Sequence, residues 1–234
     1  MKIGIMQPYL FPYVGYFQLI NSVDIFVVCN DVQYIKQGWI NRNRVLINGE
    51  PRMFIFSLKK GQQSLKINER YFSNKFEEEK NNFLKTLNSA YRKSPYYKNV
   101  MPLVLDILNY TFHKDISCFI YNSLKIICDY IGISTLFMKS SDIVKNENLK
   151  CQDKVMDMVK ILGGDVYINS IGGINLYSKE AFKKEGIDLY FIKTHDFTYK
   201  QYGNNFIPNL SIIDLLMFNS KMEMKNLLNE YDLI

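Results

Sequence analysis

The sequence predicts an α/β fold built on a mostly parallel β-sheet, and three observations carry this prediction. Short apolar runs of strand length alternate with longer stretches of helical spacing over much of the chain. The runs near residues 3–6, 23–28 and 165–168 are mostly apolar, as strands covered on both faces are. Polar residues or glycines follow each of these runs. We expect one domain over residues 1–234, with a helical insertion at residues 73–131 within it.

The N-terminal stretch is typical of a strand, a stiff loop and a helix. Residues 3–6 are apolar, and Gln7-Pro8 ends the run because proline cannot donate a ladder hydrogen bond. Pro12 and Gly15 follow in an aromatic loop before an apolar helical pattern begins. Open α/β sheets bind ligands outside the carboxyl ends of their strands. The candidate site residues here are Gln7, Tyr9, Tyr13 and Tyr16. The alternative is that the tyrosines and prolines only pack a rigid turn.

A second buried strand is expected at residues 23–28, and it also ends in polar residues, Asn30 and Asp31. Two strands joined by a helix within about thirty residues form a βαβ unit. The unit would bring Gln7, Tyr9 and Asp31 close together, because parallel strands end at the same edge of the sheet. Cys29 lies beside them, but we interpret it as a small core residue, since no histidine lies near it in the sequence.

Residues 35–44 predict a polar binding loop that contains the only tryptophan, Trp39. Asn41, Arg42 and Asn43 follow it, and these side chains can recognise phosphate, carboxylate or amide groups. The alternative is a solvated loop in which Trp39 fills the core. A hairpin is expected next at residues 45–58, with Asn48-Gly49 at its turn.

Residues 73–131 show helical spacing, interrupted at Ser94-Pro95, with further helices expected at about 99–110 and 114–131. His113 lies at the junction of those two helices, and we interpret it as structural or exposed. Gly132 is expected to end the last helix, and a strand follows it up to residue 138.

The C-terminal third alternates again between helix and strand: a helix from residue 152, a strand at 165–168, a helix at 176–185 and a strand at 187–192. Asn169, Gly172 and Gly173 follow the first of these strands, and glycines let a ligand approach the backbone closely. A plain strand-to-helix turn is an equal alternative. Gln201 and Asn209 are further pocket candidates, whereas Ser211 and Asp214 have the spacing of a helix capping box.

Composition narrows the class of protein. The net charge of +6 suits binding of an anionic small molecule or an acidic partner protein. The sequence lacks the clustered basic residues that a nucleic-acid-binding protein carries. The chain has four cysteines without zinc spacing and two histidines, His113 and His195, so we predict no metal site. No membrane span and no signal peptide are expected, which predicts a cytoplasmic location.

Several long motifs resemble the WbqC-like protein family of bacterial O-antigen and polysaccharide biosynthesis. They are MQPYLFPYVGYFQLI, DVQYIKQGWINRNRVL, YRKSPYY, YINSIGGINLYSKEAF and FIPNLSIIDLLMFN. The resemblance adds Gln33 and Tyr177 to the substrate-binding candidates. The N-terminal motif also resembles the opening of nucleotidylyltransferases, which implies a Rossmann-like core. Tyr13 and Tyr16 occupy the positions at which that family has histidines, and the absence of those histidines argues against nucleotidyl transfer.

The resemblance implies modification of an amino sugar, and we expect transfer of an acyl or aminoacyl group to the amine of a nucleotide-linked amino sugar. The donor would be a thioester of CoA or of an acidic acyl carrier protein. Asp31, as general base, and Gln7 are the expected catalytic residues. Two alternatives remain: an ATP-using enzyme of the nucleotidyl-transfer or ligase type, and a noncatalytic protein that binds an intermediate of a glycan pathway.

Overall fold

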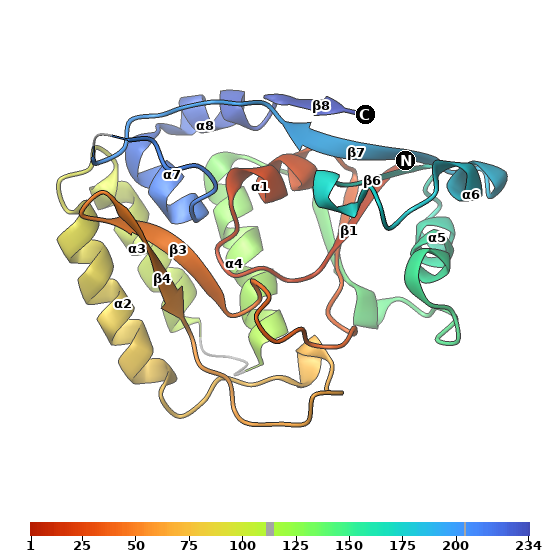
Figure 1. Ribbon diagram of the computed structural model, residues 1–234, viewed down its shortest axis with the longest axis horizontal. Helices are drawn as coiled ribbons and strands as arrows, with labels where there is room; N and C mark the ends of the chain where they lie inside the picture. The colour runs from red at the N-terminus through yellow and green to blue at the C-terminus, as the bar shows by residue number, and fades with distance from the viewer. Residues whose placement is uncertain (111–114, 204) are drawn as a thin grey trace.

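The computed structural model describes residues 1–110, 115–203 and 205–234. Within these residues, six strands form one sheet in the order β5-β2-β1-β6-β7-β8, and β3 and β4 form a separate hairpin (Figure 1). The strands are β1 Lys2–Met6, β2 Ile25–Val28, β3 Arg42–Ile47, β4 Glu50–Ile55, β5 Leu136–Lys139, β6 Val166–Ser170, β7 Asp188–Thr194 and β8 Tyr231–Leu233.

The large sheet is parallel except at one edge, where β8 pairs antiparallel with β7. From β1 the chain builds outward through β2 and β5 on one side, and it then returns to add β6, β7 and β8 on the other. The gap between the ends of β1 and β6 is therefore the topological switch point at which open α/β sheets bind ligands. The prediction of a mostly parallel, Rossmann-like α/β fold is confirmed.

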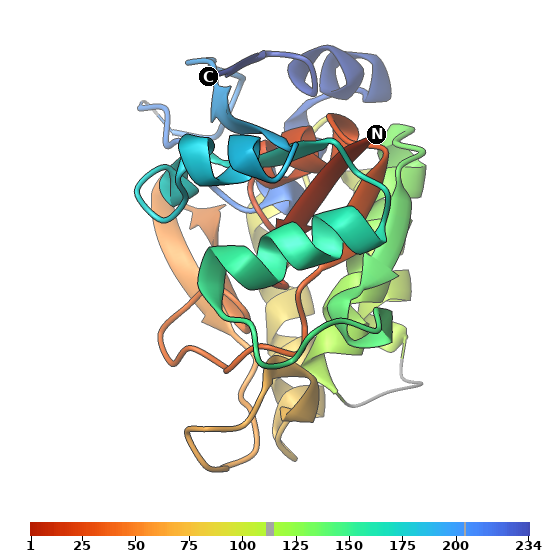
Figure 2. The same ribbon diagram turned by 90° about the vertical axis from the view of Figure 1, so that its right-hand side faces the viewer.

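Helices cover both faces of the sheet (Figure 2). Two helices, α5 and α6, lie on one face, and the others lie on the opposite face or beyond it. Their bounds are α1 Val14–Asn21, α2 Phe76–Tyr91, α3 Tyr97–Asn109, α4 Ile116–Ile131, α5 Cys151–Ile161, α6 Lys179–Lys184, α7 Ile212–Phe218 and α8 Lys221–Leu227. None of these helices is long and apolar enough to cross a membrane.

The segment predicted to be helical, residues 73–131, holds α2, α3 and α4. Asp115 begins α4 by accepting hydrogen bonds from the N–H groups of Ser117 and Cys118, and Gly132 ends it in the left-handed region at φ +82°. His113 falls outside the described residues, so its predicted role stays a prediction.

Two hydrophobic clusters hold the layers together. The larger cluster includes Phe17 of α1, Ile120 of α4 and Leu216 of α7. The smaller one lies under α5 and α6, where Tyr167 stacks on Phe182 at a ring distance of 5.5 Å. Burial on both sides explains why the central strands are nearly continuous apolar runs.

Two local predictions were wrong in their boundaries. The hairpin begins at Arg42 instead of Val45, so Arg42, Asn43 and Arg44 lie in β3 and not in a loop. Residues 171–173 form a short 3-10 turn after β6, and the following helix is shorter than expected, beginning at Lys179. In the first case pairing with β4 outweighs the low strand preference of asparagine.

Candidate functional site

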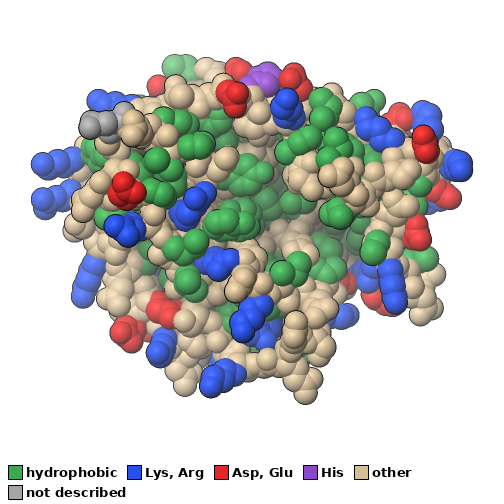
Figure 3. Space-filling view, in the orientation of Figure 1, with side chains coloured by type: hydrophobic (Ala, Val, Ile, Leu, Met, Phe, Trp, Pro, Cys, Tyr) green, Lys and Arg blue, Asp and Glu red, His purple; other side chains and the backbone are tan. Residues whose placement is uncertain are grey.

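A cleft lies over the switch point, between the N-terminal loop and the segment that follows β6. It has two compartments, with volumes of about 260 Å³ and about 590 Å³. We call them the aromatic and the aliphatic compartment. In Figure 3 hydrophobic side chains gather around a hollow in this face, with Lys and Arg side chains at one side of it. The aliphatic compartment is in the size range of ligand pockets, and the aromatic compartment is slightly smaller.

The aromatic compartment is built from the loop after β1. Tyr9 stacks on Trp39 with ring centroids 5.8 Å apart and meets Tyr16 edge-on at 6.1 Å. Tyr13 also lines this compartment. Burial raises the pKa of Tyr9 and of Tyr13, so both hydroxyls are protonated at neutral pH and can donate hydrogen bonds. The compartment therefore offers flat ring faces with polar tips, as a sugar or nucleobase site does.

The N-terminal loop is held rigidly by its neighbours. The Tyr16 hydroxyl donates to the Gln7 carbonyl oxygen at 2.8 Å. Asn43 donates from its amide to the carbonyl oxygens of Leu10 and Phe11, at 3.0 and 2.6 Å, and the Ser211 hydroxyl donates to that of Phe11 at 2.9 Å. Phe11 lies in the left-handed region at φ 44°. A strained backbone conformation of this kind persists only where several surrounding contacts hold it in place.

The aliphatic compartment lies between α5 and the end of β6. Asn169, Gly173 and Tyr177 form one wall of this compartment. They are closely packed, since a Cβ added to Gly173 would come within 2.6 Å of the Asn169 Nδ2. A Cβ on Gly172 would meet nothing closer than 3.9 Å. Cys29 also lines the wall, and burial and the nearby Asp31 raise its pKa to about 11, so the thiol is protonated at neutral pH.

The two compartments meet at a junction formed by Met6, Gln7 and Ser170, which line both of them. Among the described residues, neither the Gln7 side-chain amide nor the Ser170 hydroxyl has a hydrogen-bond partner. Unpartnered polar groups in a cleft are available to a ligand. Ser170 was not among the sequence candidates, although its place at the end of β6 carries the signal that selected Asn169.

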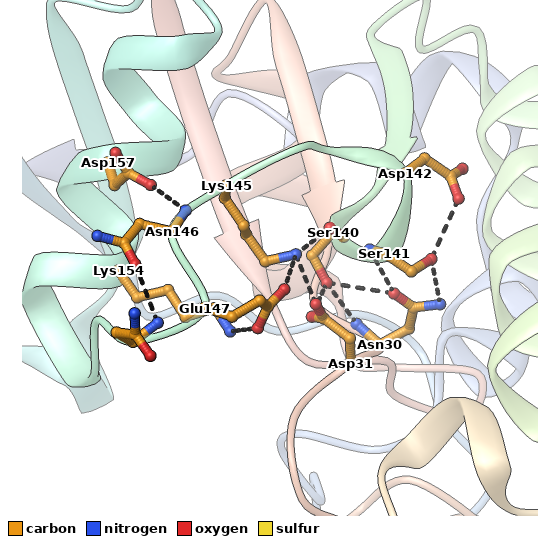
Figure 4. A network of polar contacts seen from close by, with 11 residues as sticks. Asn30, Asp31, Ser140, Ser141, Asp142, Lys145, Asn146, Glu147, Lys154 and Asp157 are labelled. Carbon is orange, nitrogen blue, oxygen red and sulfur yellow. Dashed lines mark hydrogen bonds and ion pairs between the residues drawn. The ribbon is translucent and has the colours of Figure 1, made fainter.

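Asp31 does not line the cleft. Its side chain is buried, 6% exposed, and its carboxylate lies 2.5 Å from the Nζ of Lys145 and accepts a hydrogen bond from Ser140 (Figure 4). Burial alone raises the pKa of Asp31, but the hydrogen bonds from Lys145 and Ser140 outweigh it, and the net pKa lies below the ordinary value. A saturated carboxylate of low pKa is a weak proton acceptor.

The Asp31 network continues to the wall of the aliphatic compartment. Glu147 lies 3.5 Å from Lys145 and 2.7 Å from Lys154, and Lys154 lines that compartment (Figure 4). Asp31 therefore influences the cleft indirectly, through this chain of ion pairs and through its charge near Cys29. No sequence signal marked Lys145, which lies in a polar connector.

Arg42 and Arg44 flank the indole of Trp39, at 5.8 and 5.6 Å from the ring. The Arg42 guanidinium donates to the carbonyl oxygens of Gly38 and Gln37, so it holds the Trp39 loop. Arg44 has no carboxylate partner within the described part of the chain, and its Nε is buried without a hydrogen bond. Arg44, and not the predicted Arg42, is the cation that remains available beside the aromatic compartment.

Several predicted binding residues make internal contacts away from the cleft. Gln33 donates to the Gln63 carbonyl oxygen at 3.0 Å. Asn41 accepts a hydrogen bond from Tyr34 and donates one to the Phe56 carbonyl oxygen. Asn43 is fully buried, where its amide donates to the N-terminal loop at Leu10 and Phe11. Asn209 lines a separate cavity below β7, of about 190 Å³, which shares no lining residue with the cleft. These residues shape the fold around the site instead of lining it.

Asp214 is the centre of a second buried network. Its carboxylate accepts hydrogen bonds from Tyr91 at 2.7 Å, Tyr199 at 2.6 Å and Gln201 at 3.0 Å. The predicted capping box is therefore wrong for Asp214: Ser211 caps α7 through the N–H of Ile213, but Asp214 is 0% exposed and faces the core. The predicted binding residue Gln201 likewise belongs to this Asp214 network.

Two further reactive side chains, His195 and Cys151, lie at different places. His195 is ion-paired with Asp232 and Glu230, at 3.0 and 3.3 Å, and both contacts raise its pKa. Cys151 is exposed at the start of α5, where it lines the aliphatic compartment. In the described residues, no group of three or more His, Cys, Asp or Glu side chains could hold a metal ion.

Comparison with known proteins places this chain in a family. A relative is the uncharacterised protein Rv1507c of Mycobacterium tuberculosis, which is 25% identical over 217 residues and is matched over 92% of each chain. No solved structure matches the chain. The model of the WbqC-like protein family matches residues 7–226, which include every part of the cleft except Ile5 and Met6. The chain therefore belongs to the WbqC-like protein family.

Proposed function

We propose that this protein transfers an acyl or aminoacyl group from a thioester to the amine of a nucleotide-linked amino sugar. In this proposal it is a cytoplasmic enzyme of bacterial surface-polysaccharide biosynthesis. The observation that carries the proposal is a cleft of two chemically different compartments that meet at Gln7 and Ser170. A transferase for two unlike substrates needs two binding sites with the reacting atoms held together where they meet.

The acceptor is assigned to the aromatic compartment. Tyr9 and Trp39 offer ring faces on which a base or sugar can stack. Arg44 lies over Trp39 without a carboxylate partner in the described chain, so a phosphate of the nucleotide can pair with it. This arrangement would direct the amino group of the sugar toward the junction.

The donor is assigned to the aliphatic compartment, with its thioester carbonyl at the junction. CoA and acyl carrier proteins are both acidic, and the chain carries a net charge of +6. Lys154 lies on the wall of this compartment and can meet an anionic group of the donor.

The reaction itself is a direct transfer. The amine nitrogen attacks the thioester carbonyl carbon, the new C–N bond forms and the C–S bond breaks. The leaving thiolate takes up the proton that the nitrogen releases. The Gln7 amide N–H and the Ser170 O–H would donate to the oxyanion as it develops, because both are without protein partners in the described structure. Asp31 keeps a positioning role, since Lys145 and Ser140 already saturate its carboxylate.

The test is to incubate the purified chain with nucleotide-linked amino sugars and acyl-CoA donors and to read product masses. We expect a product heavier than the sugar by one acyl group. Replacing one oxyanion donor typically costs about 100- to 1,000-fold in kcat, and we expect that loss for Gln7→Ala. The matched control is Gln33→Ala, since Gln33 is bonded to Gln63 outside the cleft.

Two other results would replace this proposal. Release of pyrophosphate from a nucleoside triphosphate would indicate the nucleotidyl or ligase alternative, for which the β1–loop–α1 unit at the switch point is a suitable scaffold. Tight binding of a nucleotide-sugar with no turnover of any donor would indicate a noncatalytic binding protein. Tyr16 gives the nucleotidyl alternative no support, because its hydroxyl is bonded to Gln7 and its side chain is 3% exposed.

A further inference from the structure

The wall of the aliphatic compartment distinguishes between the two kinds of group that the proposed function allows. Its lining is mostly apolar, with six aliphatic side chains, and nothing in it carries a negative charge. The aliphatic side chains are Ile5, Met6, Val32, Val155, Met158 and Leu176. The single charged lining residue is Lys154, a cation.

An ammonium group placed in this compartment would lose its hydration without gaining a carboxylate. Two acidic side chains beside the wall are already engaged: Asp31 is paired with Lys145, and Glu147 is paired with both Lys145 and Lys154. Lys154 would repel a second cation in the same space. Burying an unpaired charge is among the costliest changes a site can make, whereas an alkyl chain gains free energy on entering such a wall.

We propose that the aliphatic compartment binds an uncharged aliphatic acyl chain, and that it excludes aminoacyl groups, which carry an ammonium. This inference rests on the proposed function for the transfer itself, but the binding preference can be measured without turnover. The acyl carbonyl would lie at Gln7 and Ser170, and the chain would extend from there toward Val155 and Met158 of α5.

The test uses butanoyl-CoA and β-alanyl-CoA, which have the same number of heavy atoms in the acyl group and differ by a terminal methyl or ammonium. Calorimetry gives the affinity of the wild-type chain for each. We expect butanoyl-CoA to bind at least about tenfold more tightly, because the ammonium would be desolvated without a partner.

A designed carboxylate sharpens the test. Leu176 lines the compartment and is 71% exposed, so Leu176→Asp adds a negative charge to the wall without opening the core. We expect it to reduce the preference for butanoyl-CoA to about threefold or less, as a carboxylate stabilises a nearby cation. The control is Met222→Asp on α8, at a residue that is 75% exposed and away from the cleft, and it should keep the wild-type preference.

The results separate this inference from the proposed function. A preference for butanoyl-CoA that falls in Leu176→Asp and not in Met222→Asp supports the inference, even if no sugar is ever acylated. Equal or tighter binding of β-alanyl-CoA overturns it, as does a preference that Leu176→Asp leaves unchanged. Failure of both thioesters to bind also overturns it. Turnover of β-alanyl-CoA in preference to butanoyl-CoA would sustain the transferase and overturn the inference.

Discussion

The Asp214 network and the junction are both polar, and they differ in whether the protein satisfies them. Asp214 is fully buried, and Tyr91, Tyr199 and Gln201 all donate to its carboxylate. At the junction, Gln7 and Ser170 have no side-chain hydrogen bond to the described protein. A satisfied buried network stabilises one folded arrangement, whereas unsatisfied groups in a cleft are free to form hydrogen bonds with a bound molecule.

Asp31 shows that position in the fold does not decide between the two roles. It follows β2 at the same edge of the sheet where Gln7 follows β1, yet Lys145 and Ser140 saturate its carboxylate. Stability measurements on these clusters can test the contrast. Removing a structural group should lower the free energy of unfolding, whereas removing a binding group should lower activity and leave stability unchanged.

The largest expected loss of stability is at Asp214. Asp214→Ala leaves the hydroxyls of Tyr91 and Tyr199 without an acceptor, whereas Gln201 still donates to the Ile207 carbonyl oxygen, and we expect the free energy of unfolding to fall by about 3–5 kcal/mol. Denaturant unfolding measures the change. Asp106→Ala, at an exposed position of α3, should shift the value by less than about 0.5 kcal/mol. A small effect at Asp214 would mean that the donors find other partners.

Asp31→Asn should cost about 3 kcal/mol, because it leaves the buried Lys145 ammonium without its closest carboxylate. The pKa of Asp31 is lower in the folded chain than its ordinary value of 3.8. Its contribution to stability is therefore present above that value and is lost as the pH falls through the folded pKa. The difference between wild type and Asp31→Asn should be constant above about pH 5 and shrink below it. Asp129→Asn, at an exposed position of α4, serves as the control.

Asn43→Ala removes the clamp on the N-terminal loop. Two carbonyl oxygens, of Leu10 and Phe11, lose the amide that donates to them, although Ser211 still donates to the second. We expect a loss of about 2 kcal/mol. Asn81→Ala on the exposed surface of α2 should be neutral or slightly stabilising. If Asn43 bound substrate instead, its replacement would weaken binding and leave the unfolding curve in place.

The two glycines after β6 should differ from one another. Gly173→Ala would force its Cβ against Asn169, and we expect a loss of about 1 kcal/mol, or a melting temperature lower by about 2–4 °C. The Cβ of Gly172→Ala makes only an ordinary van der Waals contact, at 3.9 Å, and the melting temperature should stay within about 1 °C of wild type. A thermal scan of both variants checks this, and equal shifts would contradict the close approach at Gly173.

The smallest expected change in stability is at the junction. The double variant Gln7→Ala and Ser170→Ala removes no hydrogen bond within the described protein, so its free energy of unfolding should stay within about 0.5 kcal/mol of wild type. Its acyl transfer should nevertheless fall as described for Gln7→Ala. A loss of stability comparable to that of Asn43→Ala would place these side chains among the structural groups, and the assignment of the junction would fail.

The sequence was enough to predict which segments meet at the cleft. Polar residues after apolar strands marked Gln7, Tyr9 and Asn169, and the parallel sheet brings all three to one cleft. The same signal selected Asp31, and other patterns selected Asn41, Asn43 and Gln201, but all four make internal contacts instead. A side chain's residue type shows that it can form hydrogen bonds, but not which partner it meets.

The sequence by itself determined the strand and helix order and the aromatic N-terminal loop, because these follow from local periodicity and from proline and glycine chemistry. Tertiary structure alone decided which polar residues remain unpaired. Lys145 lies more than a hundred residues from Asp31, and Tyr91 more than a hundred from Asp214, so no local pattern connects them. Burial makes an unpaired polar group costly, so the fold pairs Asp31 and Asp214 with the distant partners that it brings near, and it leaves Gln7 and Ser170 at the cleft without such partners.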